Sequence, residues 1–97
     1  MRTALTIAGS DSSGGAGVQA DLKTMIANGV YGMSVITAIT AQNTLGIRSV
    51  LEVPAGIVKD QMDAVFTDIF PDSVKIGMLG SKAVTVAVAE RIRHYGA

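Results

Sequence analysis

The sequence contains no cysteine, which excludes a disulfide framework and metal sites built from thiolates. A single histidine, His94, cannot form a histidine metal cluster. No apolar run reaches the roughly 18 residues that a transmembrane helix needs. Met1-Arg2-Thr3 leads directly into a short apolar run, which is not the layout of a signal peptide. We therefore expect a cytoplasmic protein without membrane contacts.

The charge is balanced, with eight basic and eight acidic residues. No overall field favours nucleic acid or an anionic membrane as a partner. Apolar residues make up 48% of the chain, which is enough for a packed core. A length of 97 residues allows one domain at most.

Hydrophobic periodicity predicts alternating strands and helices. We expect strands at residues 3–8, 34–41, 47–53 and 73–77, and helices at residues 17–28, 54–70 and between Ser81 and Gly96. This order predicts an α/β fold with a mostly parallel sheet, in which residues 47–53 form an edge or flap strand. Four strands leave at least one interior-type strand without an outer neighbour. The chain is therefore expected to be the N-terminal part of a larger domain, or to be completed by another chain.

A glycine-rich loop, residues 9–17, separates the first strand from the first helix. Glycines there let backbone N–H groups approach a ligand closely. Val18-Gln19 stands where a Walker A loop needs lysine, which excludes a P-loop nucleotide site. Residues 15–20 match G-x-G-x-x-A, but the second strand ends without the acid that a dinucleotide fold uses on the ribose. A loop that only packs the helix close to the sheet remains an alternative.

Three segments are expected to meet at the carboxyl ends of the parallel strands. Asp11 and Asp21 flank the glycines, Gln42 follows the second long strand, and residues 77–80 follow the last strand. Ligands of open α/β sheets bind in the crevice at this edge. The sequence therefore predicts a small-molecule site there.

Residues 4–24, 31–44 and 75–79 resemble the hydroxymethylpyrimidine/phosphomethylpyrimidine kinases of thiamine biosynthesis, in order and at the family's spacing. The resemblance implies a ribokinase-like fold, a three-layer α/β sandwich, with residues 1–97 as the N-terminal part of one kinase domain. It implies ATP-dependent, Mg²⁺-dependent phosphorylation of 4-amino-5-hydroxymethyl-2-methylpyrimidine and then of its monophosphate. It also implies that the intact protein is a homodimer.

The same resemblance implies roles for five residues. Gln42 would hydrogen-bond the aminopyrimidine edge, and Asp21 the polar edge near the hydroxymethyl group. Gly9, Ala16 and Met78 would line the ring pocket. The family's anion hole, its catalytic base and most of its ATP site lie in sequence that this chain does not include. No catalytic residue and no metal ligand are therefore assigned here, and the 97-residue chain alone is expected to be inactive.

Two other functions remain open. Pyridoxal and pyridoxine kinases share the fold and part of the first motif, although Gln42 within Ala-Gln-Asn-Thr resembles the pyrimidine-type pocket. Alternatively, the chain is a non-catalytic fragment or binding module.

Overall fold

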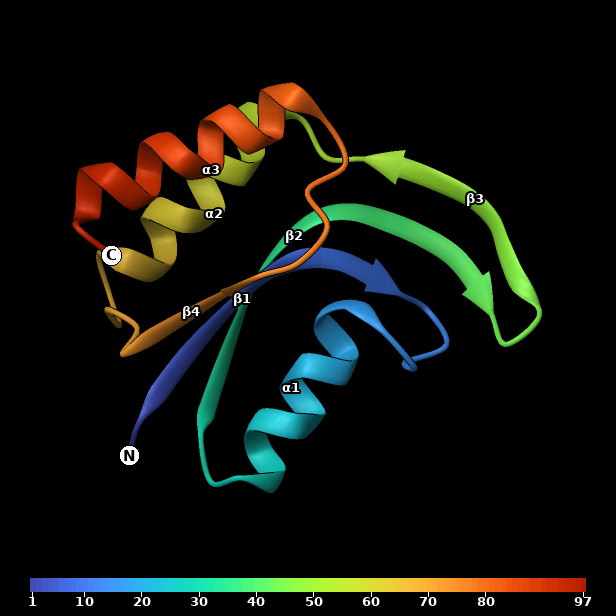
Figure 1. Cartoon of the computed structure of the whole chain (residues 1–97), viewed down its shortest axis with the longest axis horizontal. Helices are drawn as coiled ribbons and strands as arrows, with labels where there is room; N and C mark the ends of the chain where they lie inside the picture. Colours follow the sequence, from blue (N-terminus) through green and yellow to red (C-terminus); the bar gives the residue numbers. More distant parts are fainter.

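The computed structural model describes all 97 residues and has the predicted order of strands and helices (Figure 1). The elements are β1 (Thr3–Asp11), α1 (Gly17–Ala27), β2 (Tyr31–Asn43), β3 (Gly46–Glu52), α2 (Ala55–Phe66), β4 (Ser73–Ile76) and α3 (Lys82–Tyr95). No helix is both long enough and apolar enough to cross a membrane.

The four strands form one sheet in the order β3-β2-β1-β4. β1 pairs in parallel with both β2 and β4, whereas β3 is antiparallel to β2. Helix α1 covers one face of the sheet, and α2 and α3 lie together on the other (Figure 1). The result is the three-layer, mostly parallel α/β arrangement that the sequence predicted.

The main core lies between the sheet and the helix pair α2–α3. Alternate residues of β1 point into it, because successive side chains of a strand face opposite sides. Helix α2 contributes buried residues four positions apart, which places them on one side of the helix. The core residues are Leu5, Ile7, Val35, Val58, Met62, Phe66, Val84 and Val88.

Helix α2 is shorter than the expected helix at residues 54–70, and some of the apolar residues in that range are exposed. Ile57 is 51% exposed, and Ile69 lies beyond the end of the helix and is 38% exposed. The helix ends at Phe66 because the following residues return the chain to the sheet, where the backbone N–H of Thr3 donates to the Asp72 carboxylate at 2.8 Å. Pro54, expected in the first turn, immediately precedes the helix as its N-cap.

Both long strands extend beyond their predicted ends. Tyr31-Gly32 and Gln42-Asn43 lie outside the expected strand at residues 34–41 but belong to β2, where Tyr31 pairs with Thr3 and Asn43 with Gly46. Gly32 permits close packing here, because a Cβ at this position would lie 2.8 Å from Leu22 Cδ2. The two ends of α3 follow the predicted signals: the Ser81 hydroxyl caps the helix, and Gly96 closes it with φ of 68°.

The two edges of the sheet differ. The β2–β3 hairpin projects away from the helices, at the right of Figure 1, and every residue of β3 is exposed. On the opposite edge, β4 has β1 as its single strand neighbour. An open hollow of about 440 Å³ lies along β4 and the end of α3.

Candidate functional site

An open cavity of about 340 Å³ lies at the carboxyl ends of β1 and β2. Its walls come from the end of β1, the glycine-rich loop, the end of the β2–β3 hairpin, and the segment that includes and follows β4. The lining residues are Ala8, Gly9, Ser10, Asp11, Ala16, Gly17, Thr40, Gln42, Ile47, Lys75, Gly77 and Met78. The expected meeting of three chain segments at one crevice is thus confirmed.

Four of the five predicted ligand residues line this cavity: Gly9, Ala16, Gln42 and Met78. Asp21 does not. It lies on α1 and contacts the cavity wall through Lys75. The structure therefore brings the ring-pocket residues together, while their roles in binding stay predictions.

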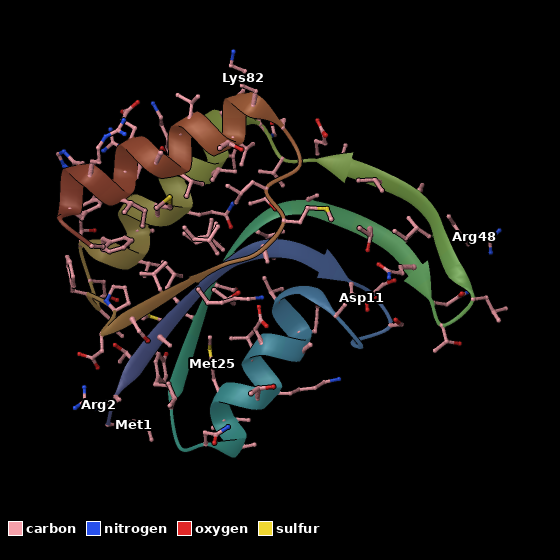
Figure 2. All side chains as sticks on the ribbon, in the orientation of Figure 1. Met1, Arg2, Asp11, Met25, Arg48 and Lys82 are labelled. Carbon is pink, nitrogen blue, oxygen red and sulfur yellow. The ribbon has the colours of Figure 1, made fainter.

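The Asp11 carboxylate holds the glycine-rich loop in shape. It accepts hydrogen bonds from the backbone N–H groups of Ser13, Gly15 and Ala16 at 2.8–3.0 Å, and from the Ser13 hydroxyl at 2.7 Å. Asp11 is only 4% exposed and lies at the end of β1, where Figure 2 labels it. The Ser13 hydroxyl and these backbone donors lower the pKa of Asp11 despite its burial.

Helix α1 is tied to the end of β1 by Gln19. Its side-chain oxygen accepts from the Asp11 backbone N–H at 2.8 Å, and its nitrogen donates to the Ser10 hydroxyl at 2.7 Å. The close approach also depends on Gly17, which has φ of 61° and forms a bridge with Ser10. A Cβ on Gly17 would lie 2.3 Å from the Gly9 carbonyl oxygen. Glycine is thus required at position 17 both for its backbone conformation and for space.

Gln42 is half-buried at the end of β2. The Ser12 hydroxyl lies 2.8 Å from the Gln42 backbone N–H and fixes the backbone there. The Thr40 hydroxyl donates its single proton to the Ser10 carbonyl oxygen, and its oxygen lies 3.1 Å from one end of the Gln42 carboxamide. One end of the carboxamide therefore contacts Thr40, and the other end is available to a ligand.

Asp21 is held between a strand residue and a lysine. Its Oδ2 accepts from the buried Thr6 hydroxyl at 2.6 Å and from Lys75 Nζ at 2.8 Å. Thr6 and Lys75 are direct partners across β1 and β4, so their side chains share the sheet face that α1 covers. Partial burial alone would raise the pKa of Asp21, but the hydrogen bonds from Lys75 and Thr6 outweigh it and the pKa is lowered.

Met78 forms an apolar part of the wall. It is 83% exposed, so it is not a core residue. Its backbone carbonyl accepts from the buried Thr37 hydroxyl at 3.2 Å, which fixes the segment after β4 against β2. Methionine on such a wall packs well against a flat aromatic ligand.

Sequence reasoning did not single out three of the lining residues, namely Thr40, Ile47 and Lys75. Ile47 depends on the fold of the hairpin, which no local pattern predicts. The sequence did offer one indication for Lys75, because it is a charged residue within a short apolar strand that ends beside the expected crevice. No group of three or more acidic or histidine side chains that could hold a metal occurs in the chain.

Comparison with known proteins identifies relatives that belong to one family of kinases. Residues 11–97 match the family model described as phosphomethylpyrimidine kinase. The hydroxymethylpyrimidine/phosphomethylpyrimidine kinase of Rhizobium meliloti (strain 1021) is 60% identical over 93 residues, which are 96% of this chain and 35% of the relative. The enzyme of the same name from Escherichia coli (strain K12) is 56% identical over 92 residues, which are 95% of this chain and 35% of that relative.

Solved structures agree with these matches. Phosphomethylpyrimidine kinase from Clostridium difficile 630 superposes with a TM-score of 0.96 at 56% identity, covering 99% of this chain and 42% of the other. An ADP complex of Bacillus subtilis pyridoxal kinase superposes with a TM-score of 0.90 at 39% identity, covering 99% of this chain and 38% of the other. The chain thus has the ribokinase-like fold of these kinases and spans 35% of the length of the first two curated relatives.

Proposed function

Because the chain belongs to the phosphomethylpyrimidine kinase family, we propose that the intact protein phosphorylates 4-amino-5-hydroxymethyl-2-methylpyrimidine and then its monophosphate in thiamine biosynthesis. Residues 1–97 form the N-terminal part of one kinase domain and supply much of the pyrimidine pocket. The observation that carries this proposal is the cavity at the ends of β1 and β2, which gathers Gly9, Ala16, Gln42 and Met78.

Each of these residues suits a flat aminopyrimidine. A carboxamide offers one acceptor and two donors, so Gln42 can pair with a ring nitrogen and an exocyclic amine together. Gly9 and Ala16 leave space for the ring, and Met78 packs against it. Asp21, through its unbonded Oδ1, serves the hydroxymethyl end, with Oδ2 held by Thr6 and Lys75.

ATP and Mg²⁺ are the proposed phosphoryl donor and metal, as the kinase family implies. The residues of this chain do not form a cluster that fits a metal ion. We therefore assign no step to Mg²⁺ and no catalytic residue here. The residues named above bind and orient the acceptor substrate, and a cytoplasmic location, where ATP is available, completes the proposal.

The test is a product assay. The intact protein, incubated with ATP, Mg²⁺ and the hydroxymethylpyrimidine, should yield first the monophosphate and then the diphosphate, resolved by chromatography. The 97-residue chain alone should yield neither. Absence of both products from the intact protein would reject the proposal. Formation of product by the 97-residue chain alone would contradict the expectation that this chain supplies only part of the active site.

Pyridoxal phosphorylation is the second candidate, because solved pyridoxal kinases from Bacillus subtilis and Staphylococcus aureus share the fold at 39% and 38% identity. The curated pyrimidine kinases are more similar, at 60% and 56%. Comparing kcat/KM for pyridoxal and for the hydroxymethylpyrimidine on the same preparation separates the two. A higher value for pyridoxal would reverse the assignment.

We also propose that the intact protein is a homodimer. Support comes from β3, where the apolar side chains of Ile47, Val50 and Leu51 are 56–66% exposed on a projecting edge strand. Analytical ultracentrifugation of the intact protein should give the mass of two chains, and Val50→Lys should shift it toward one. A monomer at all concentrations would contradict this proposal without affecting the kinase assignment.

A further inference from the structure

Two charged side chains line the cavity, Asp11 and Lys75. They differ in how many further hydrogen bonds each side chain can form. The Asp11 carboxylate already accepts four hydrogen bonds from the loop, so it is committed to the fold. Lys75 is therefore the charged group of the cavity that can still bind a ligand, and its charge is positive.

The ammonium group of Lys75 has unused donors. It can donate three hydrogen bonds, and the protein accepts one of them, at Asp21 Oδ2, 2.8 Å away. The Lys75 side chain is 54% exposed, whereas that of Asp21 is 20% exposed. The lysine is thus the more accessible member of the pair, and it lines the cavity whereas Asp21 does not.

The position of Lys75 is fixed by its surroundings. Thr6 holds the Asp21 carboxylate from β1, and that carboxylate holds the ammonium. Gly77, another cavity residue, lies beside it without crowding it, since even a Cβ there would be in ordinary contact, 3.5 Å from Lys75 Nζ. An oriented ammonium next to open space is suited to an anionic group.

The two proposed substrates differ in charge at the end that Asp21 serves. The hydroxymethyl group is neutral, but the monophosphate carries a phosphate at that oxygen. A lone carboxylate beside this phosphate would repel it, because like charges disfavour each other at close range. Lys75 cancels the carboxylate's charge and has donors left over for the phosphate.

We propose that Lys75 is a specificity-determining residue, whose ammonium group contacts the phosphate of the monophosphate and so supports the second phosphorylation over the first. This inference rests on the proposed function and on the placement of Asp21 near the hydroxymethyl end.

The test uses the intact protein with Lys75→Gln, which keeps a hydrogen-bond donor for Asp21 but removes the charge. A hydrogen bond to a charged group corresponds to about tenfold or more in affinity. We therefore expect kcat/KM for the monophosphate, divided by kcat/KM for the hydroxymethylpyrimidine, to fall at least tenfold, mainly through KM of the monophosphate. Lys75→Arg, which keeps the charge, should restore most of the ratio.

Lys59→Gln is the matched control. Lys59 also pairs with a carboxylate, Glu90 at 3.2 Å, but lies on α2, on the other face of the sheet, so the ratio should not change. Equal losses on both substrates in Lys75→Gln would show a merely structural role and overturn the inference. If the unsubstituted protein makes no product at all, the proposed function itself fails, which is a different result. If Lys75→Gln does not fold, Lys75→Arg decides: because it keeps the charge, a ratio near that of the unsubstituted protein supports the inference, and a ratio lowered about tenfold or more overturns it.

Discussion

Replacing Gly17 by alanine tests whether the loop geometry builds the cavity. Gly17 has φ of 61°, and the left-handed region costs an alanine roughly 1–2 kcal/mol. In addition, the new Cβ would lie 2.3 Å from the Gly9 carbonyl oxygen and 3.2 Å from the Asp11 backbone nitrogen. These neighbours are backbone atoms of β1, so the strand end or the helix must move, and overpacking of this kind costs roughly 1–3 kcal/mol.

Gly29→Ala is the control, because Gly29 has a similar φ of 71° but open space around its Cβ position. The loss of unfolded-state freedom that a Gly→Ala change brings is common to both variants. Urea unfolding of the intact protein should therefore show Gly17→Ala less stable than Gly29→Ala by about 1–3 kcal/mol. KM for the pyrimidine should rise only in Gly17→Ala, because Gly9 and Gly17 both line the cavity. Equal losses of stability and unchanged KM values in the two variants would refute the reasoning.

Two further outcomes are expected. The Asp11 pKa is lowered in the folded protein, so its contribution to stability is complete above the unfolded pKa of about 4 and disappears as pH falls through the lowered value. Urea unfolding at stepped pH should accordingly show a steeper acid loss for the unsubstituted protein than for Asp11→Asn, and parallel curves would contradict the assigned bonds. Gln42→Ala leaves the pyrimidine edge unpaired at a cost of about 1–3 kcal/mol, which is roughly 5- to 150-fold in KM. An unchanged KM and kcat would remove Gln42 from the site.

The order of elements could be predicted because it depends on local patterns. Period-two and period-3.6 hydrophobicity, the Ser81 cap and the glycine at position 96 are all readable within a few residues. The exact strand ends were not predictable in this way. Tyr31 joins β2 because Thr3 lies beside it, and Asn43 does so because the hairpin returns to pair with it at Gly46. Pairing between distant segments decides such positions.

The same distinction between local patterns and contacts of distant segments applies to the candidate site. The cavity edge was predictable, because the carboxyl ends of parallel strands meet there and the small residues Gly9 and Ala16 fall at that edge. The ion pair between Asp21 and Lys75 was not, since it joins residues 54 positions apart and needs the register of β1 against β4. Asp11 was noted as a loop acid, but its function of holding that loop depends on three backbone N–H groups whose directions the sequence does not contain.

The two aspartates of the site are better suited to orienting groups than to removing a proton. A general base works best when its pKa lies near the working pH. Hydrogen bonds from Ser13 and the loop backbone lower the pKa of Asp11, and bonds from Lys75 and Thr6 lower that of Asp21. Both carboxylates are thus weak bases, and Asp11 has its acceptors occupied. Neither can readily deprotonate a hydroxymethyl group, so in the proposed reaction we expect both to hold the loop and the acceptor in place.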